Sequence, residues 1–169
     1  GEPIPEELFA KMKRARTYRA GNAQMRQLSF SMADLALHMR YDPAVDGDVI
    51  EWSKAILQAY SAAKLPDGHA TIASFSHVFS SPVGYAAGYY SYKWAEVLSA
   101  DAYSAFEEAS RAIDAERETA RMGERFLNEI LARGGSRPAI ESFRAFRGRD
   151  PQIDALLRHS GMEEAPALS

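Results

Sequence analysis

Apolar side chains recur at alternating spacings of three and four residues over the segment 22–40. The residues that form this pattern are Met25, Leu28, Met32, Leu35 and Met39. An α-helix has 3.6 residues per turn, so this spacing places all of them on one face, whereas a half-buried strand requires strict alternation. The segment therefore predicts one long amphipathic helix with a buried face.

Similar patterns, bounded by turn residues, predict helices along most of the remaining chain. The expected ranges are 5–18, 48–62, 85–108, 115–133, 138–148 and 150–161. Pro5 and Asp114 are residue types that favour helix starts, and Gly134 and Gly148 are typical of helix ends. We therefore predict an all-α fold, a single multi-helix domain over residues 1–169.

The stretch from Lys64 to Gly84 breaks the helical pattern. It contains Pro66, Pro82 and many small residues. Its middle, 72–79, is compatible with a short strand, although its alternation is weak. Irregular stretches of this length inside a compact domain are often functional, so we expect a long loop with a functional role before the next helix.

Composition excludes several classes of function. The chain has 169 residues, a formal net charge of −3 and no cysteine. Nucleic-acid binding usually requires a basic domain, and no apolar run approaches the roughly 20 residues that span a bilayer. The lack of cysteine excludes disulfides, thiolate metal sites and a cysteine nucleophile. We therefore expect neither nucleic acid nor a membrane as a partner.

The four histidines do not form a metal-binding motif. None of them precedes a glutamate, and no two are four residues apart, so the H-E-x-x-H zinc motif is absent from this sequence. His38 lies among apolar helix residues and is interpreted as a core or boundary histidine. His69 and His159 lie in predicted loop or helix-end positions, where we expect them to be solvated. We therefore predict no metal ligands in this chain.

Tyrosines are concentrated just after the irregular stretch, which itself contains His77. If a helix begins at Tyr85, then Tyr85, Tyr89 and Tyr92 share one face, and Tyr90 points elsewhere. Periodicity alone favours core aromatics with satisfied hydroxyls. The small residues between the first two tyrosines favour a binding site instead, because they allow close approach. A phenol is protonated at neutral pH and can donate a hydrogen bond to a developing oxyanion.

One extended motif is far more specific than any single pattern. It reads His-x-Phe at 77–79, then Gly-Tyr-Ala-Ala-Gly-Tyr-Tyr-Ser-Tyr-x-Trp-Ala-Glu-Val-Leu at 84–98. This motif resembles the substrate-binding signature of the thimet oligopeptidase and oligopeptidase A family of zinc metallopeptidases. Further matches follow in the family's order at 1–5, 26–28, 100–103, 130–136, 146–151 and 154–157. The resemblance therefore extends over nearly the whole chain.

The resemblance implies that the chain corresponds to the C-terminal portion of such an enzyme, roughly its last quarter. The zinc-binding segment of the family lies upstream of the position that matches Gly1. The parent enzyme would use zinc to hydrolyse short peptides in the cytoplasm, with the missing N-terminal part as this chain's partner. The chain alone would hold no zinc and would be inactive.

Individual site residues follow from the same resemblance. Tyr92 matches the tyrosine thought to stabilise the tetrahedral intermediate. The positions implied to bind substrate are His77, Gly84, Tyr85, Gly88 and Tyr89. The segment from Ser80 departs from the family, since it is about two residues longer than the usual loop and is stiffened by Pro82.

A second interpretation of the sequence is a non-enzymatic helical module, derived from the family, that binds peptides or another protein. The gene upstream of Gly1 distinguishes the two. An H-E-x-x-H segment there supports the peptidase, and a start codon directly before Gly1 supports the module.

Overall fold

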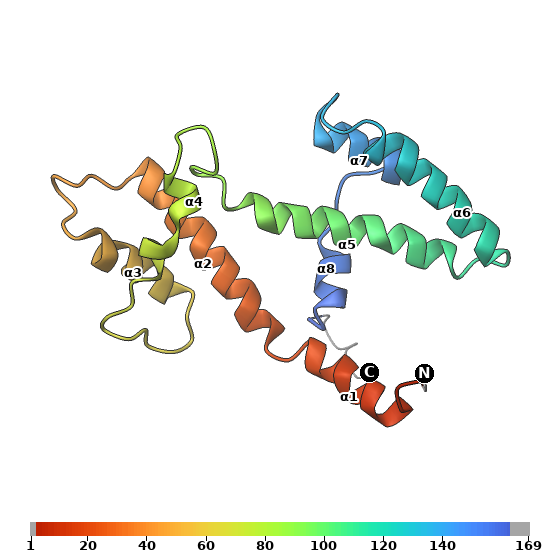
Figure 1. Cartoon of the computed structure of the whole chain (residues 1–169), viewed down its shortest axis with the longest axis horizontal. Coiled ribbons are helices and arrows are strands. Elements are labelled where there is room, and N and C mark those ends of the chain that lie inside the picture. The colour runs from red at the N-terminus through yellow and green to blue at the C-terminus, as the bar shows by residue number, and fades with distance from the viewer. Residues whose placement is uncertain (1–2, 163–169) are drawn as a thin grey trace, which may run out of the picture. The chain divides into compact units, whose positions relative to one another are not determined.

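The computed structural model describes residues 3–162, and every regular element in that range is helical (Figure 1). The predicted all-α fold is therefore confirmed. The chain forms two compact units, Gly1–Trp94 and Ala95–Ser169. Within the described residues, no helix combines the length and apolar character needed to cross a membrane. That residues 1–169 form part of one catalytic domain stays a prediction.

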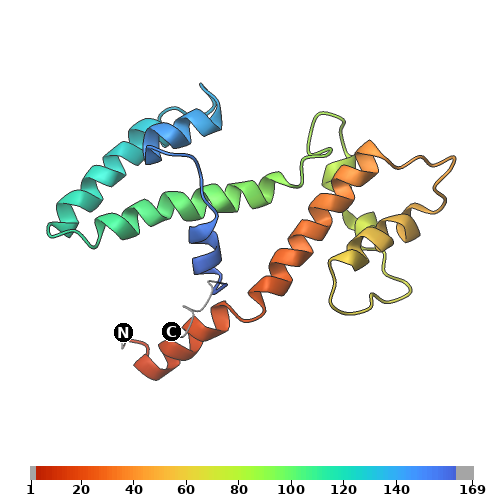
Figure 2. The same cartoon turned by 180° about the vertical axis from the view of Figure 1, so that it is seen from behind.

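The first unit is built on the long helix α2 (Ala20–Met39), which lies near α3 in both views (Figures 1 and 2). Its other elements are α1 (Glu6–Arg16), α3 (Val49–Ala59), the 3-10 turn η1 (Thr71–Ser74) and the single-turn helix α4 (Ser76–Phe79). Phe30 and Phe75 meet edge to face, with ring centroids 4.9 Å apart. The buried core consists of Phe30, Ala33, Leu57, Ile72, Phe75 and Val78. This core supports the segment that leads to the tyrosines.

The second unit contains α5 (Ser91–Ala109) from Ala95 onward. Its other elements are α6 (Ala115–Phe126), the π-helical turn η2 (Leu127–Leu131), α7 (Ala139–Arg147) and α8 (Asp154–His159). Phe126 packs on Phe106 and Phe146, with centroid distances of 6.0 and 5.3 Å. Gly148 ends α7 at φ 75°, a left-handed conformation that favours glycine, and its N–H donates to the Arg144 carbonyl.

Two predicted helix starts and one possible strand differ from the structure. The tyrosine-rich helix begins at Ser91 and not at Tyr85, because Ala87 has φ 53°, a left-handed value that an α-helix of L-residues cannot accommodate. The possible strand at 72–79 is instead the helical pair η1 and α4. The last helix begins at Asp154, four residues later than expected.

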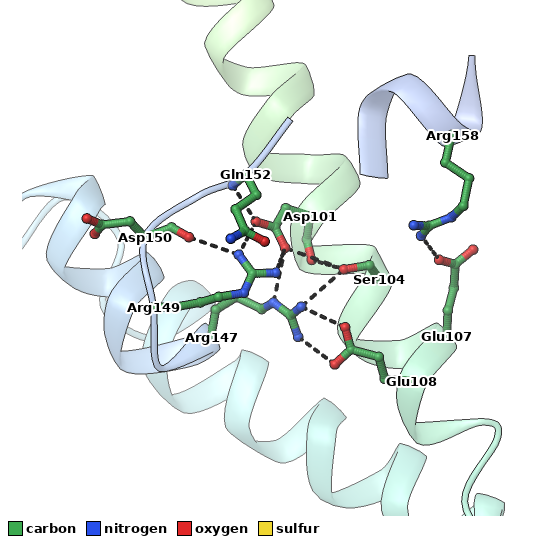
Figure 3. Close-up of polar contacts among 9 residues, drawn as sticks. All are labelled: Asp101, Ser104, Glu107, Glu108, Arg147, Arg149, Asp150, Gln152 and Arg158. Atoms are coloured by element: carbon green, nitrogen blue, oxygen red, sulfur yellow. Dashed lines mark hydrogen bonds and ion pairs between the residues drawn. The ribbon is translucent and has the colours of Figure 1, made fainter. Parts of the chain in front are cut away.

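An ion-pair network centred on Asp101 joins α5 to the end of α7 and the segment that follows it (Figure 3). The Asp101 side chain is 1% exposed. Arg149 donates to its two carboxylate oxygens, each at 2.6 Å. Arg147 donates to it at 3.2 Å, and the Gln152 N–H donates at 2.8 Å. Arg147 also donates to both oxygens of Glu108, at 3.0 and 2.8 Å. The buried carboxylate is thus compensated from three sides.

These contacts set the direction of two pKa shifts. Burial acts to raise the pKa of Asp101, but hydrogen bonds from Arg149 and Gln152, with the charges of Arg149 and Arg147, outweigh it and lower the pKa. For Glu108, the hydrogen bond from Arg147 is the largest cause, and the pKa is again lowered. Both carboxylates therefore bind protons less readily in the folded state than in the unfolded state.

We expect the second unit to lose stability in acid. A carboxylate with a lowered pKa stabilises the fold above its unfolded pKa, and this contribution disappears as the pH falls through the folded pKa. The ordinary values are 3.8 for Asp101 and 4.5 for Glu108, so the loss is expected below about pH 4.5. Urea unfolding followed by circular dichroism at about pH 5 and about pH 3 measures it.

Asp101→Asn provides the comparison for this measurement. Asparagine has no titrating proton, so the variant should be less stable at the higher pH and should lose less stability on acidification. An equal loss in both proteins would show that other groups control the acid response.

Candidate functional site

One histidine and three tyrosines converge in the first unit. His77 lies on α4, Tyr85 and Tyr89 lie in the turns before α5, and Tyr92 lies in the first turn of α5. The His77 ring centroid is 5.6, 5.9 and 6.5 Å from those of Tyr85, Tyr89 and Tyr92. The predicted grouping of the three tyrosines is seen in the ring contacts, but the tyrosine spacing attributed it to one helical face and did not predict that His77 joins them. The turns, together with α4 and α5, bring the rings together.

Two of the tyrosines present their rings to solvent. Tyr85 and Tyr92 are 50% and 41% exposed. Their rings are nearly parallel, at 5° between planes, with centroids 6.2 Å apart. A neutral phenol both donates and accepts hydrogen bonds, and a histidine ring nitrogen can do either, depending on its tautomer. This arrangement offers several hydrogen-bonding groups to a ligand on one exposed surface.

Tyr89 is held differently from the other two tyrosines. Its ring stacks on Phe75 at 5.2 Å and meets Phe30 edge to face at 5.8 Å. Its hydroxyl donates to Gln27 Oε1 at 3.0 Å. Burial and the neighbouring Tyr92 raise the pKa of Tyr89, with the Arg26 charge opposing them. Tyr89 therefore stays protonated and has the contacts of a core aromatic with a satisfied hydroxyl.

The two glycines of the motif differ in their local surroundings. A Cβ added at Gly88 would lie 3.1 Å from the Tyr85 carbonyl oxygen, a tight contact that the neighbouring backbone would have to relieve by a few tenths of an ångström. A Cβ at Gly84 would meet only ordinary contacts with Ser81, the nearest at 3.5 Å. The turn between Tyr85 and Tyr89 therefore favours a glycine at 88, where the chain approaches itself closely. A binding role for Gly84 and Gly88 stays a prediction.

The other three histidines lie in separate environments. His38 Nδ1 lies 3.0 Å from Asp34 Oδ1, and its ring stacks on Phe79 at the edge of the core. His69 is partly buried in the loop before η1. His159 is only partly solvated, because its side chain is 24% exposed and lies 3.1 Å from Glu107.

Across residues 3–162, no three His, Cys, Asp or Glu side chains come close enough together to hold a metal ion. The described residues therefore do not fit a zinc site, which in proteins requires three or four such ligands. The possible contribution of this surface to chemistry is hydrogen bonding and positioning.

Sequence reasoning missed two residues that fix the tyrosines. Gln27 accepts the Tyr89 hydroxyl, and Asp34 accepts the backbone N–H of Tyr89 at 2.8 Å. An aspartate inside an otherwise apolar stretch of a predicted helix was an available signal, since charged side chains are seldom buried without a partner. Their partners are 62 and 55 residues away in sequence, so the pairing itself was not accessible from local patterns.

Comparison with known proteins places the chain in a class of peptidases. Its residues 1–162 match Peptidase family M3, and the chain belongs to that family. It is 45% identical over 168 residues to organellar oligopeptidase A, chloroplastic/mitochondrial, of Arabidopsis thaliana, covering 99% of this chain and 21% of that protein. The resemblance to the oligopeptidase A family is therefore confirmed.

Bacterial relatives give the same result. The chain is 43% identical over 163 residues to oligopeptidase A of Escherichia coli (strain K12), covering 96% of this chain and 23% of the relative. It is 31% identical over 165 residues to dipeptidyl carboxypeptidase of Salmonella typhimurium, again covering 96% and 23%. The chain thus spans less than a quarter of the length of these relatives.

Proposed function

We propose that this chain supplies one wall of the substrate cleft in a zinc-dependent oligopeptidase that hydrolyses short peptides. The observation that supports this most directly is the convergence of His77, Tyr85 and Tyr92, with both phenols about half exposed. A bound peptide carries a carbonyl oxygen and an N–H at every residue, so a surface with several hydrogen-bonding groups suits it.

Each residue of the cluster would have a distinct role in binding the peptide or stabilising the transition state. The Tyr92 hydroxyl would donate to the scissile carbonyl oxygen as negative charge develops there. His77 and Tyr85 would contact the peptide and fix its position. Tyr89 would contribute mainly to the shape of the peptide-binding surface, because its ring is packed on the core and its hydroxyl already donates to Gln27. Gly88 would allow the turn to approach closely.

The zinc ligands of the proposed enzyme would be residues outside the range 3–162. In the family resemblance, zinc supplies an activated water for attack on the peptide bond. Residues 3–162 offer no suitable ligand group. A cytoplasmic location, implied by the same resemblance, stays a prediction, since the names of the plant relatives include both organellar and cytosolic forms.

A peptidase assay on two proteins tests the proposal. One is the 169-residue chain, and the other is a longer family protein that carries this sequence. We expect the longer protein to cleave short fluorogenic peptides and to lose activity with a chelator. The shorter chain should neither cleave them nor hold stoichiometric zinc. About one tightly held zinc in the shorter chain, with chelator-sensitive hydrolysis, would contradict the proposal.

The same assay addresses the alternative module. A non-enzymatic binding function predicts saturable peptide binding by the 169-residue chain and no hydrolysis by the longer protein. Hydrolysis by the longer protein would exclude that alternative for this sequence.

A further inference from the structure

Asp34 is a fully buried carboxylate on α2. Its side chain is 0% exposed, beside the buried Ala33 and near the core aromatic Phe30. A charged side chain in such surroundings is destabilising unless hydrogen bonds or opposite charges compensate it. Its partners therefore indicate which part of the fold the carboxylate serves.

Most of those partners lie in residues 85–89, the segment that carries Tyr85 and Tyr89 and is called the tyrosine turn below. Asp34 Oδ1 accepts the Ala87 N–H at 3.2 Å, and Oδ2 accepts the Tyr89 N–H at 2.8 Å. His38 Nδ1 lies 3.0 Å from Oδ1 and 2.9 Å from the Asp34 carbonyl oxygen. One side chain on α2 thus holds two backbone groups that are more than 50 residues away in sequence.

The turn that Asp34 holds has an intrinsically unfavourable backbone. Ala87 has φ 53°, and a left-handed conformation costs an L-residue roughly 1–2 kcal/mol. The next residue, Gly88, approaches the Tyr85 carbonyl closely and donates its N–H to it at 2.9 Å. Such conformations persist only where surrounding contacts determine them, and they are frequent at functional sites. Asp34 accepts the N–H of Ala87 itself and that of Tyr89, the residue after Gly88.

We propose that Asp34 is a positioning residue for the substrate surface. By accepting the N–H groups of Ala87 and Tyr89, it fixes the turn that carries Tyr85 and Tyr89, and so sets where those rings lie around His77. Asp34 itself is buried and does not touch substrate. The proposal rests on the proposed peptidase function for its kinetic consequence, but its structural part stands independently.

Asp34→Asn tests the structural part in the 169-residue chain. The two backbone N–H groups bond to different Asp34 oxygens, and asparagine replaces one of these oxygens by an NH₂ group that cannot accept, so one of the two bonds is lost in this geometry. We expect amide hydrogen exchange at Ala87 or Tyr89 to accelerate at least about tenfold, while exchange at Leu57 in the core of the same unit changes little. Unchanged exchange at both turn amides would overturn the proposal.

Asp48→Asn is the matched control. Asp48 Oδ1 also accepts two backbone N–H groups, those of Ile50 and Glu51, at 2.8 and 3.0 Å, but at the start of α3. Asparagine is an equally good N-cap, so this variant should leave exchange in the tyrosine turn unchanged. An equal acceleration in both variants would mean that general loosening, and not loss of the Asp34 contacts, is responsible.

If Asp34→Asn does not fold, the hydrogen bond between Asp34 and the Tyr89 amide can be tested in the unaltered chain. A through-hydrogen-bond scalar coupling between the Tyr89 amide nitrogen and the Asp34 carboxyl carbon reports that bond directly by NMR. We expect this coupling to be detectable, since the donor and acceptor are 2.8 Å apart. Its absence, in a spectrum that shows such couplings within α2, would overturn the proposal.

Kinetics of a longer family protein carrying the sequence separate this proposal from the proposed function. Misplacing binding groups by about 1 Å can cost 10²-fold in rate, so Asp34→Asn should lower kcat by about 10–100-fold with a smaller change in KM. If the turn amides open but kcat is unchanged, the positioning role is supported and the catalytic use of the tyrosines is contradicted.

Discussion

Replacing Tyr92 with phenylalanine, in a longer family protein that carries this sequence, is expected to lower kcat by about 10²–10³-fold, or roughly 2.7–4 kcal/mol. The phenol is 41% exposed and lies beside His77 and Tyr85, so its hydroxyl can reach a bound peptide. Negative charge builds on the scissile carbonyl oxygen only as the tetrahedral intermediate forms. A donor directed at it therefore stabilises the transition state more than the bound substrate, and its loss appears in kcat.

Tyr90→Phe provides a matched control, because it removes the same kind of group, a phenol hydroxyl, from a tyrosine two residues earlier in the sequence. Tyr90 is similarly exposed, at 46%, and the ring contacts found over residues 3–162 do not link it to the cluster. It should leave kcat nearly unchanged. Thermal melts of both variants check that folding is intact, since each keeps its phenyl ring. An unchanged kcat for Tyr92→Phe, or a rise in KM alone, would restrict Tyr92 to substrate binding.

Local periodicity was sufficient to predict most of the helices. The three-and-four spacing around Met32 corresponds to α2, and the capping aspartate at 114 and the glycine at 148 correspond to the start of α6 and the end of α7. These signals work because they depend on neighbours within one or two turns. Such patterns therefore predict the type and the approximate limits of a long helix.

Contacts between distant residues explain where the sequence-based predictions failed. The segment 85–90 has helix-forming alanines and a favourable tyrosine spacing, and periodicity extended the helix through it. The fold instead holds Ala87 in a left-handed conformation, with Asp34 accepting the flanking N–H groups. Tertiary hydrogen bonds override local propensity here. The motif still singled out residues whose rings lie together in the structure, although the structural reason for their convergence was different.

The same limitation applies in the second unit. The segment 146–151 was singled out only as a family match, and nothing in its local pattern showed that Arg147 and Arg149 enclose a buried carboxylate on α5. Their partner Asp101 is more than 40 residues away. The family match singled out this segment, but its structural role, pairing with the buried Asp101, is visible only in the structure.

Asp101→Ala is expected to destabilise the second unit by about 3–5 kcal/mol, because it removes the buried carboxylate that pairs with Arg147 and Arg149. The Arg147 side chain is 7% exposed and, among the residues that the structure describes, would keep Glu108 as its charged partner at 2.8 Å. The Gln152 N–H would also lose its acceptor. Amide exchange of Phe146, which is 1% exposed in the core of this unit, reports the free energy of opening there.

Asp150→Ala separates a buried charge from an ordinary surface pair. Asp150 pairs with Arg144, and the two side chains are 65% and 55% exposed, so solvent screens their attraction. Exposed pairs contribute little to stability, and we expect Asp150→Ala to change it far less than Asp101→Ala does. Similar destabilisation by both substitutions would mean that burial does not control the Asp101 network. Asp101→Ala should destabilise the unit more than Asp150→Ala because it removes hydrogen bonds donated by two arginines and a backbone amide. Water does not readily replace those bonds, since the Asp101 side chain is 1% exposed.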